Sequence, residues 1–187
     1  MTMTVYKIIA QAIGIIAMAF NILSYQQKSA KGAITFQLFG CTLFAVNFFM
    51  LDAVVGSIMN LIGACRAVIF MKKDAFRANH VGWLIGFTAV YVGSYVLTFT
   101  VFGTPFTLRN ALLELLPIIG MTVSTISFRT GSAKLIRRFG LVCSPAWLVY
   151  NVANHALGAI VCEVISLCSI VVGMWRYDMR GDKEEAA

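Results

Sequence analysis

Two polar side chains, Asn60 and Glu163, stand at corresponding places inside two long apolar segments. Polar groups in such segments are costly and usually serve binding or transport. A neutral amide opposite an ionisable carboxyl group suits a polar solute that carries a hydrogen-bond donor or a positive charge. A carboxyl group that takes up and releases a proton also permits proton coupling. The alternative interpretation is that Glu163 bonds to a neighbouring helix and only fixes its packing.

Two further pairs could line the same pocket. Trp147 and Asn151 are four residues apart and therefore share one face of a helix. An indole beside an amide can stack on and hydrogen-bond a sugar ring, or it can be an interface aromatic next to a helix–helix hydrogen bond. Asn21 and Ser124 also occupy corresponding places, and they either line a solute path or bond between helices.

Charged residues near or within the apolar segments are harder to assign. Arg66 lies six residues before Lys72, which is about 9 Å of helical rise. We favour a side chain that extends to the polar surface over one that pairs with an acid in the core. Arg109 lies five residues before Glu114, which is poor helical spacing for an ion pair. A solvated helix end is therefore preferred to an external gate.

Catalysis finds no support in the sequence. The chain lacks a nucleophile–base set, a phosphate-binding loop and a metal-ligand spacing, and its five cysteines lie in apolar runs. Such cysteines are typical of small buried hydrophobic residues. We therefore expect neither an enzyme nor a bound metal or cofactor.

The elements that must position these residues are transmembrane helices. The chain is 59% hydrophobic and only 12% charged, whereas soluble domains carry about 25% charged residues. So few charges cannot cover a water-facing surface, and runs of about 20 apolar residues span a bilayer. Seven runs have this character: 8–25, 33–51, 53–71, 81–102, 110–128, 137–153 and 156–174. The sixth run is short, and Arg137 and Arg138 are expected to mark its membrane interface.

The net charge of +7 has a membrane explanation rather than a nucleic-acid one. With seven spans, twelve basic residues fall on one side and two, Lys7 and Arg109, on the other. Basic loops stay in the cytoplasm, so the N-terminus is expected outside and the C-terminus inside. An even number of spans would remove this asymmetry. The twelve are Lys28, Lys31, Lys72, Lys73, Arg77, Arg129, Lys134, Arg137, Arg138, Arg176, Arg180 and Lys183.

An internal repeat organises the spans. Residues 11–73 recur as residues 114–176, 103 positions later and without a gap; the run SAK at 29–31, for example, returns at 132–134. Each copy holds three spans and one further span separates them, so both copies have the same orientation. The sequence predicts an all-α membrane protein with seven transmembrane helices in a 3+1+3 arrangement: two parallel three-helix bundles joined by a linker helix. The expected units are a first bundle (1–78), the linker helix (79–103), a second bundle (104–178) and a cytoplasmic tail (179–187).

This arrangement resembles the SWEET and PQ-loop superfamily of transporters. Residues 28–35, KSAKGAIT, resemble the K-S-x-x-G-[IL]-S segment that follows the first helix in PQ-loop proteins. Residues 60–63, NLIG, resemble the N-x-x-G of the third SWEET helix. The chain is most similar to the bacterial inner-membrane YgjV family. It departs from the superfamily because neither 19–20 nor 122–123 holds the Pro-Gln pair.

The resemblance implies a bacterial inner-membrane transporter that moves a sugar-like or other small polar metabolite by alternating access. In SWEET-like proteins, asparagines at the places of Asn60 and Glu163 face each other across the pocket, and here one is a carboxylate. The expected partners are the lipid bilayer and the solute, without nucleic acid, and a homo-oligomer is left open. The alternative is a SWEET-like protein that does not transport: a scaffold, a sensor or a lipid-binding protein.

Overall fold

The computed structural model describes residues 3–51, 54–154 and 157–179. This part of the chain is all-helical. A π-helical segment, η1 (Met174–Met179), continues the last helix directly. The seven α-helices are α1 (Met3–Ser24), α2 (Ala30–Met50), α3 (Val54–Met71), α4 (Val81–Thr100), α5 (Leu108–Thr130), α6 (Ala133–Ala153) and α7 (Leu157–Gly173). Each predicted span is therefore confirmed as a helix.

The two copies of the repeat begin their second helices in the same way. The Ser29 side chain accepts a hydrogen bond from the Gly32 amide at the start of α2, and Ser132 accepts one from the Leu135 amide at the start of α6. A serine at this place satisfies a backbone donor that the first helical turn leaves free. The preceding helix α5 ends at Gly131, whose φ of 68° lies in the left-handed region.

Five of the helices have the length and composition needed to cross a membrane: α1, α2, α4, α5, and α7 together with η1. The part of α3 from Ser57 to Met71 is equally apolar but shorter. The helix α6 carries Lys134, Arg137 and Arg138 in its first two turns, so its apolar stretch starts late. The chain is a multi-pass membrane protein.

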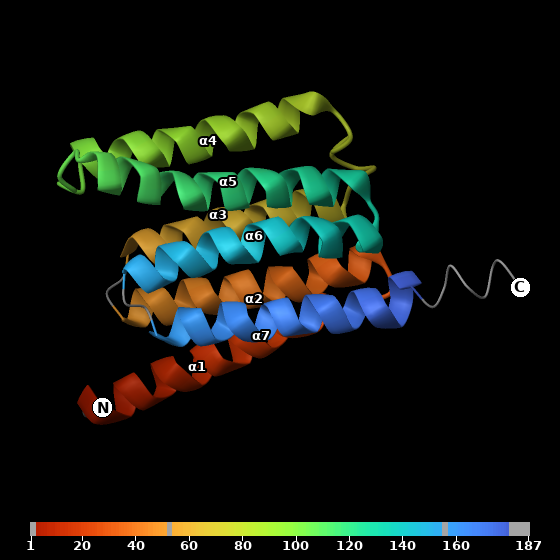
Figure 1. Cartoon of the computed structure of the whole chain (residues 1–187), viewed down its shortest axis with the longest axis horizontal. Helices are drawn as coiled ribbons and strands as arrows, with labels where there is room; N and C mark the ends of the chain where they lie inside the picture. The colour runs from red at the N-terminus through yellow and green to blue at the C-terminus, as the bar shows by residue number, and fades with distance from the viewer. Residues whose placement is uncertain (1–2, 52–53, 155–156, 180–187) are drawn as a thin grey trace, which may run out of the picture.

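Helix contacts follow the repeat. In the first copy α2 packs against both α1 and α3, and in the second copy α6 packs against both α5 and α7. Between the copies, α1 contacts α7, α2 contacts α6, and α3 contacts α5. The helix α4 packs mainly on α5, at the upper edge of Figure 1. Because α1 corresponds to α5 and α3 to α7, the α1–α7 and α3–α5 seams are equivalent.

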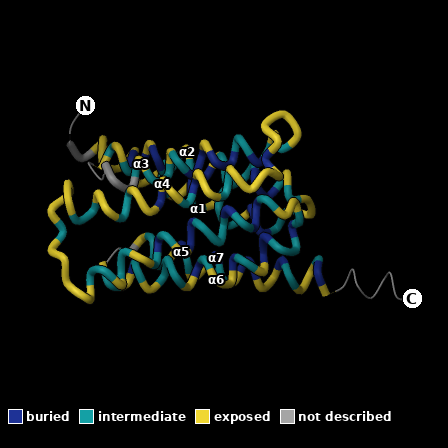
Figure 2. The backbone as a smooth tube through the Cα atoms, turned by 90° about the horizontal axis from the view of Figure 1, so that it is seen from above, coloured by how far each residue is buried: buried dark blue, intermediate teal, exposed yellow. Residues whose placement is uncertain are grey.

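The buried core lies between the copies. Its members are aromatic and aliphatic side chains from both copies and from α4: Tyr25, Ile34, Phe70, Phe87, Tyr91, Met121, Phe128, Ile136 and Ile170 are among them. Figure 2 shows α2 and α3 on one side of the molecule and α5, α6 and α7 on the other. Large aliphatic side chains face outward along the helices; Ile8 and Ile85 are each 63% exposed and Val171 is 57% exposed. Such an apolar exterior suits lipid rather than water.

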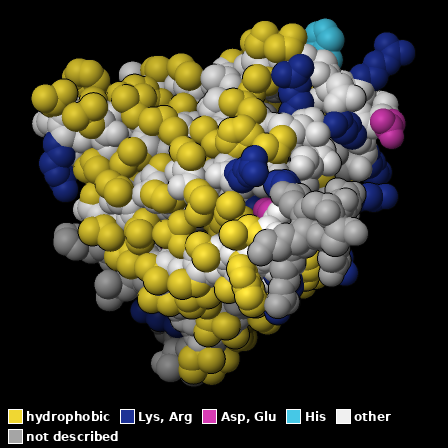
Figure 3. Space-filling view, turned by 45° about the vertical axis from the view of Figure 1, so that its right-hand side comes forward, with side chains coloured by type: hydrophobic (Ala, Val, Ile, Leu, Met, Phe, Trp, Pro, Cys, Tyr) yellow, Lys and Arg dark blue, Asp and Glu magenta, His cyan; other side chains and the backbone are white. Residues whose placement is uncertain are grey.

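The two ends of the molecule differ in charge. The ends of α1, α3, α5 and α7 lie together on the right of Figure 1, and α2, α4 and α6 start there. Ten of the described lysines and arginines occupy this end, between Lys28 and Arg176, and we call it the basic end. Lys7 and Arg109 lie at the other end. Figure 3 shows Lys and Arg side chains gathered toward one side of a largely hydrophobic surface.

Candidate functional site

The Glu163 carboxyl group lies among polar side chains from three helices. Ser144 of α6 is within hydrogen-bonding reach of Glu163 on α7, and also of the Tyr25 hydroxyl at the end of α1. Glu163 is also close enough to Tyr25 and Cys143 to act on both electrostatically. Glu163 itself is partly buried, whereas Tyr25 and Ser144 are buried. The arrangement surrounds one carboxyl group with hydroxyl and thiol groups, which can hold a polar ligand or a proton.

Asn21 lies close to these residues because it contacts Cys162, which precedes Glu163 in the sequence. The Cys162 thiol on α7 is within hydrogen-bonding reach of Asn21 on α1 and of Ser166 one turn further along α7. The name Glu163 cluster is used below for Asn21, Tyr25, Ser144, Cys162 and Glu163. Asn21 and Glu163 are among the site residues predicted from the sequence, whereas Tyr25, Ser144 and Cys162 are not. Their contacts come from helices that only folding brings together.

The other predicted residues lie outside the Glu163 cluster. Asn60 is partly buried on α3, a helix that contributes nothing to the cluster as defined. Ser124 is partly buried on α5, where its carbonyl accepts a hydrogen bond from the Ser127 hydroxyl. Asn151 is buried on α6. Their role in binding a solute stays a prediction.

The Trp147 indole packs within the second copy. A Cβ atom at position 120 of α5 would lie 2.9 Å from Trp147 Nε1, so Gly120 gives the indole its room. The ring also makes an edge-to-face contact with Tyr150, with 5.9 Å between the centroids. Trp147 therefore contributes to the α5–α6 packing; its role as a pocket wall stays a prediction.

We expected the Arg66 side chain to extend to the polar surface, but the structure places it inside the protein. Its side chain is buried, and Nη1 donates to the Met121 carbonyl (3.1 Å) and to Thr125 Oγ1 (3.4 Å) on α5. The Tyr91 hydroxyl on α4 lies 3.5 Å from the same nitrogen, and the guanidinium carbon lies 4.8 Å from the Phe128 ring centroid. The side chain is held inside by neutral hydrogen-bond acceptors on α4 and α5. The sequence of α3 alone could not indicate them.

The α1–α7 seam has a serine at the position where the α3–α5 seam has Arg66. Ser169 occupies the place of Arg66 in the repeat, and its hydroxyl donates to the Ile22 carbonyl on α1 at 2.8 Å. Gln26 Nε2 donates to the Ser169 carbonyl and hydroxyl at 2.7 and 2.9 Å. Equivalent positions therefore join the copies at both seams, through a neutral serine at the α1–α7 seam and through a cationic arginine at the α3–α5 seam.

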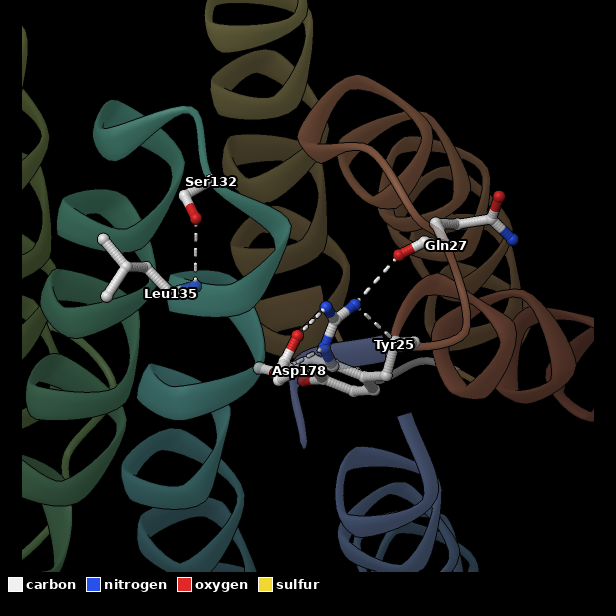
Figure 4. Close-up of polar contacts among 6 residues, drawn as sticks. Tyr25, Gln27, Ser132, Leu135 and Asp178 are labelled. Atoms are coloured by element: carbon white, nitrogen blue, oxygen red, sulfur yellow. Dashed lines mark hydrogen bonds and ion pairs between the residues drawn. The ribbon is translucent and has the colours of Figure 1, made fainter. Parts of the chain in front are cut away.

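Arg137 also differs from the expectation that it marks the membrane interface. It is buried on α6 and forms an ion pair with the buried Asp178 of η1, with Nε 3.1 Å from Oδ2. Its Nη1 donates to the Gln27 carbonyl at 2.9 Å and to the Tyr25 carbonyl at 3.5 Å, beyond the end of α1. Figure 4 shows Asp178, Gln27 and Tyr25 converging on this guanidinium. We call this set the Arg137 clamp. Arg138, by contrast, is exposed, as an interface residue should be.

Several of the side-chain hydrogen bonds between the described parts of the two copies lie toward the basic end, in addition to those of the Glu163 cluster. They include the Arg137 clamp, the Ser169 and Arg66 bridges, and the bond from Lys73 Nζ to the Arg129 carbonyl at 2.9 Å. Toward the other end, Asn47 donates to the Ala10 carbonyl within the first copy, at 2.6 Å.

Glu114 and a surface pocket complete the polar features. Tyr150 on α6 is within hydrogen-bonding reach of Glu114 on α5, and Arg109 is exposed, so the structure gives no sign of an Arg109–Glu114 gate.

An open pocket of about 720 Å³ lies at the basic end beside the α3–α4 loop, lined by residues that include Lys73 and Trp83. In the part of the chain that the structure describes, no group of three histidine, cysteine or carboxylate side chains could hold a metal ion.

Comparison with known proteins identifies one family. The model of Imp-YgjV, described as bacterial inner membrane protein, matches residues 8–180. The curated proteins and the solved structures contain no match to the chain.

Proposed function

Because the chain belongs to the Imp-YgjV family of bacterial inner membrane proteins, we propose that it is a transporter of a small polar solute. The two copies would act as two parallel three-helix bundles, with α4 as the linker helix. The contacts of α1 with α7 and of α3 with α5 support this arrangement, because a two-fold axis along the membrane normal relates such seams.

The observation that carries the proposal is the set of side-chain bonds that join the two copies toward the basic end. Transport by alternating access needs a protein that closes at one end while the other end can part. The bonds between the copies toward the basic end, above all the Arg137 clamp, suit a state closed there. Basic loops stay in the cytoplasm, so this state would be closed toward the cytoplasm, with the N-terminus outside and the C-terminus inside.

The Glu163 cluster is the proposed solute site. Glu163 would accept a donor or a cationic group of the solute, and Asn21 and Ser144 would add hydrogen bonds. Asn60 would approach from the first copy when the bundles rock. Trp147 and Asn151 would shape one wall, and Ser124 the path beyond it. We propose that the site binds a solute without a chemical reaction, and so that the protein is not an enzyme.

Flux measurements in proteoliposomes test the site. Labelled sugars, amino acids and small cations would be offered to the wild-type protein, and Glu163→Gln should lower the flux of the accepted solute by roughly tenfold or more, since loss of one charged contact costs about 1.5–3 kcal/mol. The matched control is Glu114→Gln, which makes the same change in a carboxyl group outside the cluster and should leave the flux intact. Flux that survives combined Asn60→Ala and Glu163→Ala would refute the site.

A non-transporting membrane protein is the second candidate, because Trp147 fills the α5–α6 interface and the core between the copies is packed. A scaffold or sensor would hold one arrangement of its helices. It would show no flux for any solute in the same proteoliposomes, and the Glu163→Gln change would alter only stability.

A further inference from the structure

Two arginines are equally buried in this protein, but only one has a counter-charge in contact. Arg137 and Arg66 are 3% and 4% exposed. Arg137 contacts the Asp178 carboxylate and two carbonyls. Among the described residues, the contacts of the Arg66 guanidinium are all neutral: a carbonyl, a thioether, two hydroxyls and a phenyl ring.

The hydrogen-bonding capacity of Arg66 is also incompletely used. A guanidinium has five N–H donors, and it keeps its charge because arginine does not release its proton in proteins. The oxygen acceptors around Arg66 all lie at Nη1, and the buried Nε has no hydrogen-bond partner. A charge within a membrane-spanning helix is costly unless an opposite charge or strong acceptors compensate it.

Glu163 is the acid to consider as a partner, because both it and Arg66 act electrostatically on the Cys143 sulfur. The hydrogen-bonding partner of Glu163, however, is Ser144 on α6, whereas the Arg66 guanidinium contacts α4 and α5. The two charged groups therefore have different hydrogen-bonding partners.

We propose that Arg66 is a binding site for a small anion, either chloride or a single carboxylate group. The guanidinium supplies the charge and its unused N–H groups. The Tyr91 hydroxyl, 3.1 Å from Thr125 Oγ1, supplies a further donor by rotating toward the anion. Tyr91, Thr125 and Phe128 are each at most 1% exposed, so space beside Arg66 is scarce and a large anion would not fit. The inference is independent of transport, because such a site can hold a resident ion or part of a solute.

Thermal unfolding of the full chain in detergent micelles tests the site with chloride, formate and acetate as probes. Ionic strength is kept constant with a bulky sulfonate. At a probe concentration 100 times Kd, the Tm of the wild-type protein should rise by roughly 5–10 °C and reach a plateau. Saturation by chloride alone would identify a halide site, and competition by formate or acetate would identify a carboxylate site.

Variants separate this site from other effects of salt. Arg66→Met should abolish the rise, because it removes the charge and the N–H groups that hold the anion. Arg137→Met, which removes an arginine that already has its partner, should lower Tm in every buffer and keep the anion response. Tyr91→Phe should weaken the apparent affinity several-fold, and it tests the site even if Arg66→Met does not fold.

The variant Glu163→Gln distinguishes this inference from the proposed transport function. It should lose flux and keep the anion-dependent rise in Tm. Equal anion responses of the wild-type protein and Arg66→Met, or no saturable response of the wild-type protein, would overturn the proposal. An apparent affinity that is unchanged in Tyr91→Phe would also overturn it.

Discussion

Removal of the Asp178 charge should destabilise the protein more than most single substitutions. Asp178→Asn keeps the size of the side chain but leaves the Arg137 guanidinium buried without its anion. Loss of one partner of a buried ion pair costs about 3–5 kcal/mol. The Gln27 carbonyl still accepts from Arg137 at 2.9 Å, and the new amide can accept one bond, so we expect the lower end, about 3 kcal/mol.

The assay is a double-mutant cycle measured by thermal and denaturant unfolding in micelles. For a chain of this length, 3 kcal/mol corresponds to a fall in Tm of roughly 6–12 °C. The combined change Arg137→Met and Asp178→Asn removes both charges, so it should be more stable than Asp178→Asn alone, with a coupling free energy of about 2 kcal/mol or more.

Two results would refute this reasoning. If Asp178→Asn changes the free energy of unfolding by less than about 0.5 kcal/mol, the pair is a surface interaction and not a buried clamp. If the effects of the two changes add strictly, Arg137 and Asp178 do not depend on one another.

Three further changes test local parts of the fold by thermal unfolding. Gly173→Ala should destabilise by roughly 1–3 kcal/mol, since its Cβ atom would lie 2.5 Å from the Tyr25 carbonyl oxygen, which is backbone and cannot move alone; an unchanged Tm would contradict the close approach. Gly120→Ala should cost a similar amount and shift the fluorescence of Trp147, whose indole must move; an unshifted spectrum would contradict the contact. Ser132→Ala should cost about 1 kcal/mol by removing the N-terminal cap of α6, and Ser132→Asp should restore it.

The helices could be predicted from the sequence because lipid imposes a simple rule. Every backbone polar group must be satisfied within the segment, so each long apolar run becomes a helix. The serines that start α2 and α6 were visible as the repeated Ser-Ala-Lys run.

The positions of the charged side chains could not be predicted in the same way. The sequence predicts Arg137 at the membrane interface because it starts an apolar run. In the structure it is buried and paired with Asp178, which lies 41 residues later in the chain. Arg66 was expected to extend along its own helix, but acceptors on α4 and α5 hold it inside. Such contacts depend on how helices pack, which hydropathy does not encode.

The candidate site was predicted in part for the same reason. Glu163 stood out because a carboxyl group in an apolar run is rare. Tyr25 and Ser144 did not, because one follows the end of a helix and the other is a small polar residue that any membrane helix tolerates. Their common position at Glu163 is a property of the α1–α6–α7 packing.

The central claim is that the two copies move against one another. Spin-label distances test it without knowledge of the solute, in a background in which the five native cysteines are replaced. Lys31 and Arg138 report on the basic end, and Leu51 and Asn154 report on the other; all four are exposed and lie on or next to α2 and α6.

We predict one distance between Lys31 and Arg138 in the otherwise unchanged protein. In the variant that combines Arg137→Met with Asp178→Asn, a second, longer distance should appear there, together with a shorter distance between Leu51 and Asn154. Single, unchanged distances at both ends in both proteins would contradict alternating access.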